Sequence, residues 1–192
     1  MNFIIECPTD IVNGSQVTKE YRQILHGKVA GGAGSRNPEE YQRQKIIEGT
    51  NVSCPTTKTR INKRTNVMED ISHPMKKDNG YDYTENFDGL QIFDTKKIYV
   101  NLKSVVGKGG TQTRTLRDEC YPFIEAQLNF LIKSSPDDIY FANIFDGDEA
   151  SDNMSKFHYL CNLSEYFGVR GRVYVGDLQG YFGWLKTIVS SQ

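Results

Sequence analysis

Asp88, Asn101 and Lys103 are the residues of this chain whose types and spacing point most directly to chemistry. Asp88 opens one strand-like segment, and Asn101 and Lys103 lie in the next one, beyond a turn at 94–97. Alternate residues of a strand point to the same face, so Asn101 and Lys103 should project together. The neighbouring strand can bring Asp88 to that face. A carboxylate, a carboxamide and an ammonium group arranged in this way would suit a divalent metal beside a phosphodiester.

The metal that fits this group best is Mg²⁺, which prefers oxygen ligands from one or two protein groups, water and phosphate. Asp88, the side-chain oxygen of Asn101 and a backbone carbonyl near Leu102 could supply them. Such a metal polarises a phosphate and acidifies a bound water, while Lys103 could stabilise the developing negative charge or position that water. Zn²⁺ fits less well because imidazole and thiolate ligands are missing here. A plain surface hairpin with solvated polar side chains is the alternative.

A cationic, glycine-rich segment follows at 106–117, and it predicts contacts with nucleic acid. Glycines let backbone N–H groups approach a phosphate closely. Lys108, Arg114 and Arg117 could pair with phosphates, the arginines could read guanine, and Gln112 could read adenine. A nucleotide-binding P-loop fits poorly because its Gly-Lys-Ser/Thr ending is absent. An ordinary turn with helix-capping threonines is the other interpretation.

Length and charge are compatible with one nucleic-acid-binding domain. The 192 residues suffice for a single hydrophobic core, and we interpret 1–192 as one domain. The net charge is only −1, but basic side chains gather locally, and charges act over about 8–10 Å in physiological salt. We interpret residues 49–79 as a long flexible loop that contacts DNA. Its candidate contacts are Lys58, Arg60, Lys63 and Arg64.

Several classes of protein are disfavoured. No run approaches the roughly 20 apolar residues of a membrane span, and the N-terminus lacks the pattern of a secretory signal. The four cysteines are widely spaced and the three histidines are scattered, which disfavours a disulfide framework or a zinc site. We expect a protein of the reducing cytoplasm with no membrane partner.

Periodic apolar residues predict the order of the elements. Helices are expected at 15–28, from Pro38 to about Glu48, at 112–133 with either a kink or a later start at Pro122, at 150–167 and at 181–189. Strands are expected within 81–106, at 139–145 and at 172–178. The acidic stretch 146–149 is interpreted as a strand-to-helix connection. A hairpin followed by crossover helices predicts an α/β fold with a central mixed sheet and helices on both faces.

Residues 88–147 resemble the core of the PD-(D/E)xK nuclease superfamily, and of type II restriction endonucleases in particular. The family pattern is Asp on one strand, (Asp/Glu)-x-Lys on the next, then a helix and a further strand. Asp88 matches the first acid and Lys103 the lysine, whereas Asn101 departs from the usual acid, which would lower the ligand charge. The resemblance implies metal-dependent, sequence-specific cleavage of double-stranded DNA by a homodimer, or by a monomer acting twice. It also implies a glutamate from an N-terminal helix near the metal, for which we choose Glu48 over Glu39 and Glu40.

Two other functions stay open from the sequence. Asn101 could mark lost chemistry, which would leave a non-catalytic DNA-binding protein on a degenerate nuclease fold. The acidic strand end at Asp146 could instead serve a small-molecule or RNA-processing enzyme.

Overall fold

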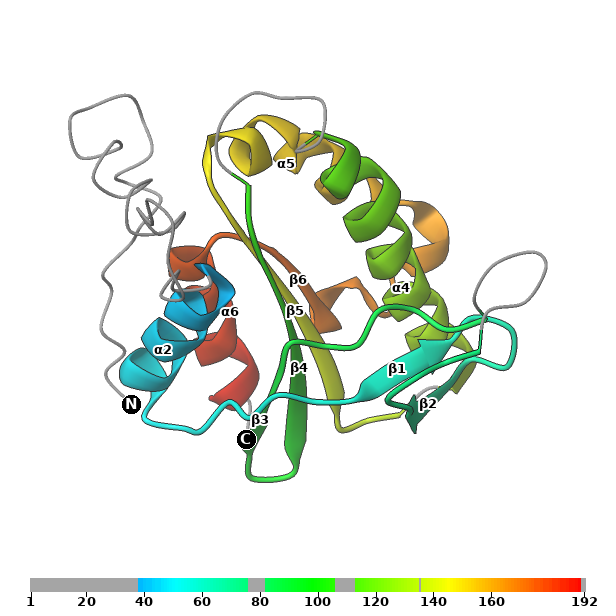
Figure 1. Cartoon of the computed structure of the whole chain (residues 1–192), viewed down its shortest axis with the longest axis horizontal. Helices are drawn as coiled ribbons and strands as arrows, with labels where there is room; N and C mark the ends of the chain where they lie inside the picture. Colours follow the sequence, from blue (N-terminus) through cyan, green and yellow to red (C-terminus); the bar gives the residue numbers. More distant parts are fainter. Residues whose placement is uncertain (1–37, 76–81, 106–112, 135, 191–192) are drawn as a thin grey trace.

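The computed structural model describes residues 38–75, 82–105, 113–134 and 136–190 (Figure 1). The predicted helix at 15–28 lies outside them, as do Lys108 and Gln112 of the glycine-rich segment and residues 76–79 of the predicted loop. In chain order the elements are α2 (Pro38–Thr50), β1 (Thr59–Asn62), β2 (Val67–Asp70), β3 (Gly89–Phe93), β4 (Lys96–Ser104), the π-helix η1 (Thr115–Cys120), α4 (Tyr121–Ser134), β5 (Ile139–Asp146), α5 (Asp148–Cys161), the 3₁₀ turns η2 (Ser164–Tyr166) and η3 (Arg170–Arg172), β6 (Val173–Gly176) and α6 (Leu178–Val189).

A four-stranded mixed sheet with the order β3-β4-β5-β6 forms the centre of the described structure. β3 and β4 are antiparallel, and Phe93 pairs with Lys96 across a turn in which Asp94 takes a φ of 52°. Aspartate tolerates this left-handed backbone. β5 runs parallel to β4 on one side and to β6 on the other. The α/β class with a mixed sheet is therefore confirmed.

Helices cover both faces of this sheet, as the sequence predicts (Figure 1). On one face, α4 and α5 pack over an apolar cluster that includes Phe87, Leu128 and Phe141. On the other face, α2 and α6 pack over a second cluster that includes Ile46 and Leu102. β4 contributes to both clusters because its side chains alternate between the two faces.

The ends of the helices follow local chemistry. α2 begins at the predicted Pro38 and ends before Asn51, whose left-handed backbone (φ 56°) is typical of a residue after a helix. α6 begins three residues earlier than predicted because Asp177 caps it, its Oδ1 accepting from the Gly180 N–H at 2.7 Å. Before α4 the helix is π-helical, and the Tyr121 N–H donates to the Leu116 carbonyl. The neighbouring Pro122 has no N–H to donate, which fits a change of helical register at this point.

The prediction of a long loop at 49–79 is wrong for 59–70, which form the antiparallel hairpin β1–β2. Its strands are short and mostly polar, so they carry little apolar periodicity. The Asn62 side chain holds the turn by accepting from the N–H groups of Arg64 and Thr65 at 3.0 and 3.1 Å. Two further predicted elements are too long: α5 ends at Cys161, and β6 spans only Val173–Gly176.

Two helical glycines predict opposite effects on stability. A Cβ at Gly49 would lie 2.5 Å from the ring of the buried Phe182, whereas a Cβ at Gly183 would meet nothing within 4 Å. We expect Gly49→Ala to lower the free energy of unfolding by about 1–3 kcal/mol through overpacking. Gly183→Ala should raise it by about 0.5–1 kcal/mol by removing backbone freedom from the unfolded chain. Urea denaturation of both variants measures the two effects, and equal shifts would contradict this packing of α2 on α6.

Within the described part of the chain, no helix has the length and apolarity needed to cross a membrane.

Candidate active site

Asp88, Asn101 and Lys103 line one cavity of about 170 Å³. Lys103 and Asn101 project from the same face of β4, and Asp88 sits directly before β3, beside them in the sheet. The segment that leads into β3 also contributes Glu85 and Asn86. Glu119, Cys120 and Phe123 close the cavity from η1 and α4. The predicted convergence of a carboxylate, a carboxamide and an ammonium group is thus present in the structure.

The backbone of β4 holds Asp88 at both its main chain and its side chain. The Asp88 N–H donates to the Val100 carbonyl at 2.8 Å, which extends the β3–β4 pairing by one residue. The Leu102 N–H donates to Asp88 Oδ2, also at 2.8 Å. This second bond holds the carboxylate at Leu102, the residue between Asn101 and Lys103 in β4.

Burial and charge act together on Asp88 and Lys103. Burial raises the pKa of Asp88, although the Leu102 N–H and the Lys103 charge oppose the shift. Burial alone would lower the pKa of Lys103, but the carboxylates of Asp88 and Glu39 outweigh it and raise that pKa. Lys103 Nζ lies 3.3 Å from Glu39 Oε1. Lys103 therefore keeps its positive charge. A further positive charge nearby would stabilise the ionised form of Asp88.

Asn101 belongs to a cluster of buried carboxamides on the α4 face of the sheet. Its side-chain nitrogen donates to Asn143 Oδ1 at 3.1 Å, and Asn143 in turn exchanges two hydrogen bonds with Gln127 of 3.0 and 2.7 Å. Because the amide nitrogen of Asn101 is used inside the protein, its oxygen is the atom suited to a ligand. This oxygen is a neutral donor, weaker for a cation than a carboxylate.

One face of α2 approaches the site through Glu39, Gln42 and Arg43. Gln42 Nε2 donates to the Lys103 carbonyl at 3.1 Å and to Asp146 Oδ2 at 2.7 Å. An Arg43 guanidinium nitrogen donates to the Asp88 carbonyl at 2.7 Å. Sequence analysis missed Gln42 and Arg43, although their spacing of three and four residues from Glu39 places all three on one helical face.

The structure does not bring the chosen Glu48 to the site. Glu48 lies nine residues after Glu39, about 13 Å further along the helix axis, and pairs with Lys45 at 3.0 Å. Glu39, one of the two competing acids, is the glutamate next to Lys103, whereas Glu40 pairs with Arg43. The helix was predicted correctly, but the sequence did not reveal which end faces the sheet.

Asp146 is fully buried at the end of β5, and this disfavours a substrate site there. It accepts from Gln42 and from the Leu178 N–H at 3.2 Å, and burial raises its pKa to about 6. The connection that follows is the predicted one: Gly147 takes a φ of 115°, and α5 begins at Asp148.

The candidate DNA contacts separate into exposed and buried groups. Lys58, Lys63, Arg64, Arg114 and Arg117 have exposed side chains, although Arg117 pairs with Asp118 at 2.6 Å.

Arg60 is the exception, and its assignment as a DNA contact is corrected. Its side chain is only 12% exposed and donates to the carbonyls of Ile71 and Thr84 and to the Asn86 side chain. These bonds occupy its guanidinium group inside the protein. Arg60 therefore joins the β1–β2 hairpin to the segment that precedes β3.

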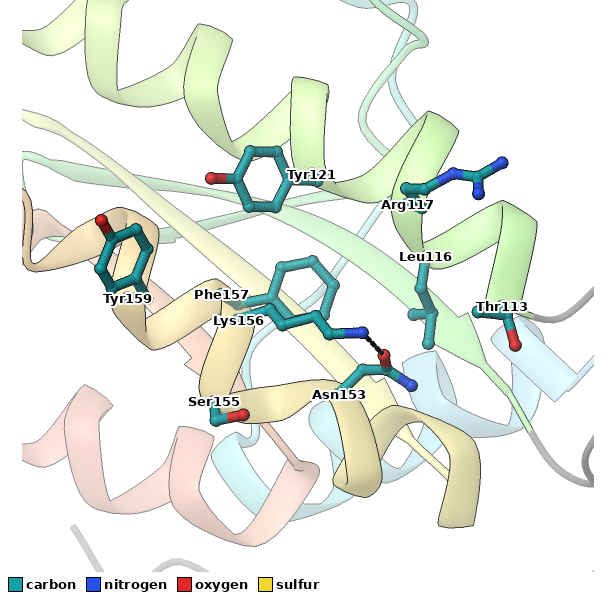
Figure 2. Close-up of a pocket in the computed structure, with 9 residues that line it drawn as sticks. All are labelled: Thr113, Leu116, Arg117, Tyr121, Asn153, Ser155, Lys156, Phe157 and Tyr159. Carbon is teal, nitrogen blue, oxygen red and sulfur yellow. Dashed lines mark hydrogen bonds between the residues drawn. The ribbon is translucent and has the colours of Figure 1, made fainter.

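A larger cavity of about 650 Å³ lies between the start of α4 and α5 (Figure 2). Leu116, Tyr121 and Phe157 give it mainly apolar walls, and Lys156 reaches along it to Asn153 at 2.7 Å. The guanidinium of Arg117 points away from it in Figure 2. This cavity lacks the carboxylate and ammonium pair of the smaller cavity. We therefore take the smaller cavity as the candidate active site.

The possible ligand atoms in the smaller cavity are oxygens, the atom type that a hard cation prefers. These oxygens come from Asp88 and Asn101, and Glu39 pairs with the Lys103 ammonium group. Such oxygens are ligands that Mg²⁺ accepts and Zn²⁺ does not favour. Within residues 38–75, 82–105, 113–134 and 136–190, no group of three or more His, Cys, Asp or Glu side chains is arranged to hold a metal. A metal here would depend on the amide of Asn101, on water and on substrate phosphate.

Neither a protein-family model, nor a curated protein, nor a solved structure matches this chain.

Proposed function

We propose that this protein is a Mg²⁺-dependent endonuclease that cleaves double-stranded DNA at a short specific sequence, in the manner of a small type II restriction enzyme. The meeting of Asp88, Asn101 and Lys103 in one cavity carries the proposal. Their order along an antiparallel hairpin, followed by a helix and a parallel strand, resembles the PD-(D/E)xK pattern with Asn in place of the second acid and supports the proposal.

The side chains have distinct tasks in this reaction. Asp88 and Asn101 would hold the metal, and bound Mg²⁺ would polarise the phosphate and acidify a water. Lys103 stays protonated beside Asp88 and Glu39, so its ammonium group is suited to stabilising negative charge on the phosphate oxygens. Glu39 orients that ammonium group.

The test is incubation of the purified protein with plasmid and genomic DNA of known sequence, with Mg²⁺ or with EDTA. We expect discrete fragments that need Mg²⁺ and that disappear in Asp88→Asn. Slower migration of the DNA in a gel, without cleavage, would reject the enzymatic function and favour a DNA-binding protein. An absence of both cleavage and binding at low salt would reject both functions.

A non-catalytic DNA-binding protein on the same fold is the second candidate. Two observations favour it: the amide nitrogen of Asn101 already donates to Asn143, and among the described residues no group of three His, Cys, Asp or Glu side chains is arranged to hold a metal. Asn101→Asp discriminates between the candidates, since added ligand charge should raise activity or lower the Mg²⁺ requirement of an enzyme.

DNA affinity should depend on the turn of the β1–β2 hairpin, whose Lys63 and Arg64 side chains are exposed. A two-stranded ribbon fits a DNA groove, and removing one phosphate-binding side chain reduces the salt dependence of binding by about one unit of slope. We expect the double variant Lys63→Ala/Arg64→Ala to weaken binding for all sequences, with its free energy of unfolding unchanged. Arg60→Ala should instead destabilise the fold. Filter binding at several salt concentrations, beside urea denaturation, separates these effects.

Two sites related by twofold symmetry match the two strands of a palindrome, so a homodimer accompanies this proposal, and a monomer acting twice is the alternative.

A further inference from the structure

α2 contacts both halves of the candidate site through backbone carbonyls, not only through Glu39. Arg43 donates to the carbonyl of Asp88 at 2.7 Å, and Gln42 donates to the carbonyl of Lys103 at 3.1 Å. Asp88 leads directly into β3, whereas Lys103 lies in β4. Two consecutive helical residues thus hold the carboxylate-bearing segment and the ammonium-bearing strand at the same time.

The two side chains retain unsatisfied polar atoms, which general packing does not explain. Gln42 is fully buried and its Oε1 has no hydrogen-bond partner. Arg43 has a side chain that is 12% exposed, and its buried Nε also lacks a partner. Leaving a polar atom unpaired in the interior is unfavourable, so each side chain carries a cost that its hydrogen bonds to the site must offset.

We propose that Gln42 and Arg43 are positioning residues that set the separation of the Asp88 carboxylate from the Lys103 ammonium group. This inference rests on the proposed nuclease function for its kinetic consequences. Arg43 fixes the main chain of Asp88, and the Leu102 N–H donates a hydrogen bond to the Asp88 carboxylate. Gln42 fixes the main chain of Lys103 against Asp146, and Glu39 receives the ammonium group.

The chain offers matched controls for both residues. Gln91 is as fully buried as Gln42, and it donates to the Val52 carbonyl away from the cavity. Arg172 donates to the carbonyls of Ile139 and Pro136 at the opposite end of the sheet. Gln42→Met and Arg43→Met are therefore compared with Gln91→Met and Arg172→Met, which remove similar bonds elsewhere.

The kinetic experiment measures single-turnover cleavage of duplex DNA at saturating enzyme, at a temperature where all variants are folded. We expect Gln42→Met and Arg43→Met each to lower the cleavage rate about 10- to 100-fold while DNA affinity stays within twofold. The two controls should keep the wild-type rate. Arg43→Lys retains one donor and should recover at least tenfold over Arg43→Met. Equal rates in test and control variants would overturn the proposal.

A second readout does not require any activity. The Leu102 amide signal in an NMR spectrum reports its hydrogen bond to Asp88, so Arg43→Met should shift it and speed its hydrogen exchange at least tenfold. Arg172→Met should leave it unchanged. If the wild type cleaves no DNA and this amide still responds to Arg43 alone, the positioning role stands and the nuclease is rejected. An amide that ignores Arg43→Met and Arg43→Lys rejects the positioning role, whatever the activity.

Discussion

Under the proposed nuclease function, Lys103→Ala is expected to lower the rate of DNA cleavage by about 10²–10³-fold while leaving the fold and the affinity for DNA nearly intact. The physical reason is the loss of a fixed positive charge from a half-buried cavity, where such charges act strongly on developing negative charge. The neighbouring Asp88 and Glu39 keep the Lys103 ammonium group protonated, so it is present throughout the neutral pH range. Single-turnover digestion of plasmid DNA with saturating Mg²⁺ measures the loss.

Lys97→Ala is the matched control for this variant. Lys97 lies on the same strand, near its other end, and pairs with Asp138 at 2.8 Å on the surface. It should cleave at the wild-type rate. Undiminished cleavage by Lys103→Ala would remove the lysine from the mechanism, and with it the main reason for assigning the reaction to this cavity.

The second large effect concerns stability and pH, and it originates at Asp146. Burial raises the pKa of this carboxyl from 3.8 to about 6 in the folded protein. A raised folded-state pKa gives stability that is fully present below about pH 4 and is lost as pH rises through about 6. A shift of about two units at about 1.4 kcal/mol each makes this loss about 2–3 kcal/mol between pH 4 and pH 8.

Asp146→Asn removes the titration. The free energy of unfolding of the variant minus that of the wild type should therefore grow by about 2–3 kcal/mol from pH 4 to pH 8, whatever its value at one pH. Asp138→Asn should show the opposite trend, and below about pH 4, because the hydrogen bond from Lys97 lowers the pKa of Asp138 and so gives stability that is lost as pH falls. Urea denaturation at several pH values measures both trends. A flat difference for Asp146→Asn would show that this carboxyl has an ordinary pKa.

The sequence predicted most of the regular elements because apolar periodicity records burial directly. The hairpin at Asp94, the buried strand β5 and the helices that cover the sheet all carry that signal. The β1–β2 hairpin carries little of it, because its strands are short and mostly polar and hydrogen bonds made by Asn62 and Arg60 help to hold it. Side-chain hydrogen bonds of this kind depend on three-dimensional proximity and leave no periodic pattern.

The candidate site shows the same division. Asp88, Asn101 and Lys103 could be found because strand alternation and a short turn relate them within 16 residues. Gln42 and Arg43 act on carbonyls of residues about 45–60 positions away in the chain, so only the packing of α2 on β4 reveals them. The choice of Glu48 over Glu39 failed for the same reason, since the orientation of α2 against the sheet is a tertiary property.

Under the proposed nuclease function, the composition of the small cavity has a consequence for the order in which metal and DNA bind. Glu85, Asp88 and Glu119 line it together with Lys103, so carboxylates outnumber ammonium groups among the lining residues. A phosphate entering this cavity alone would meet net repulsion. We therefore expect a divalent ion to bind first and to allow the DNA backbone to approach. Productive binding of DNA should then increase with the concentration of the divalent ion.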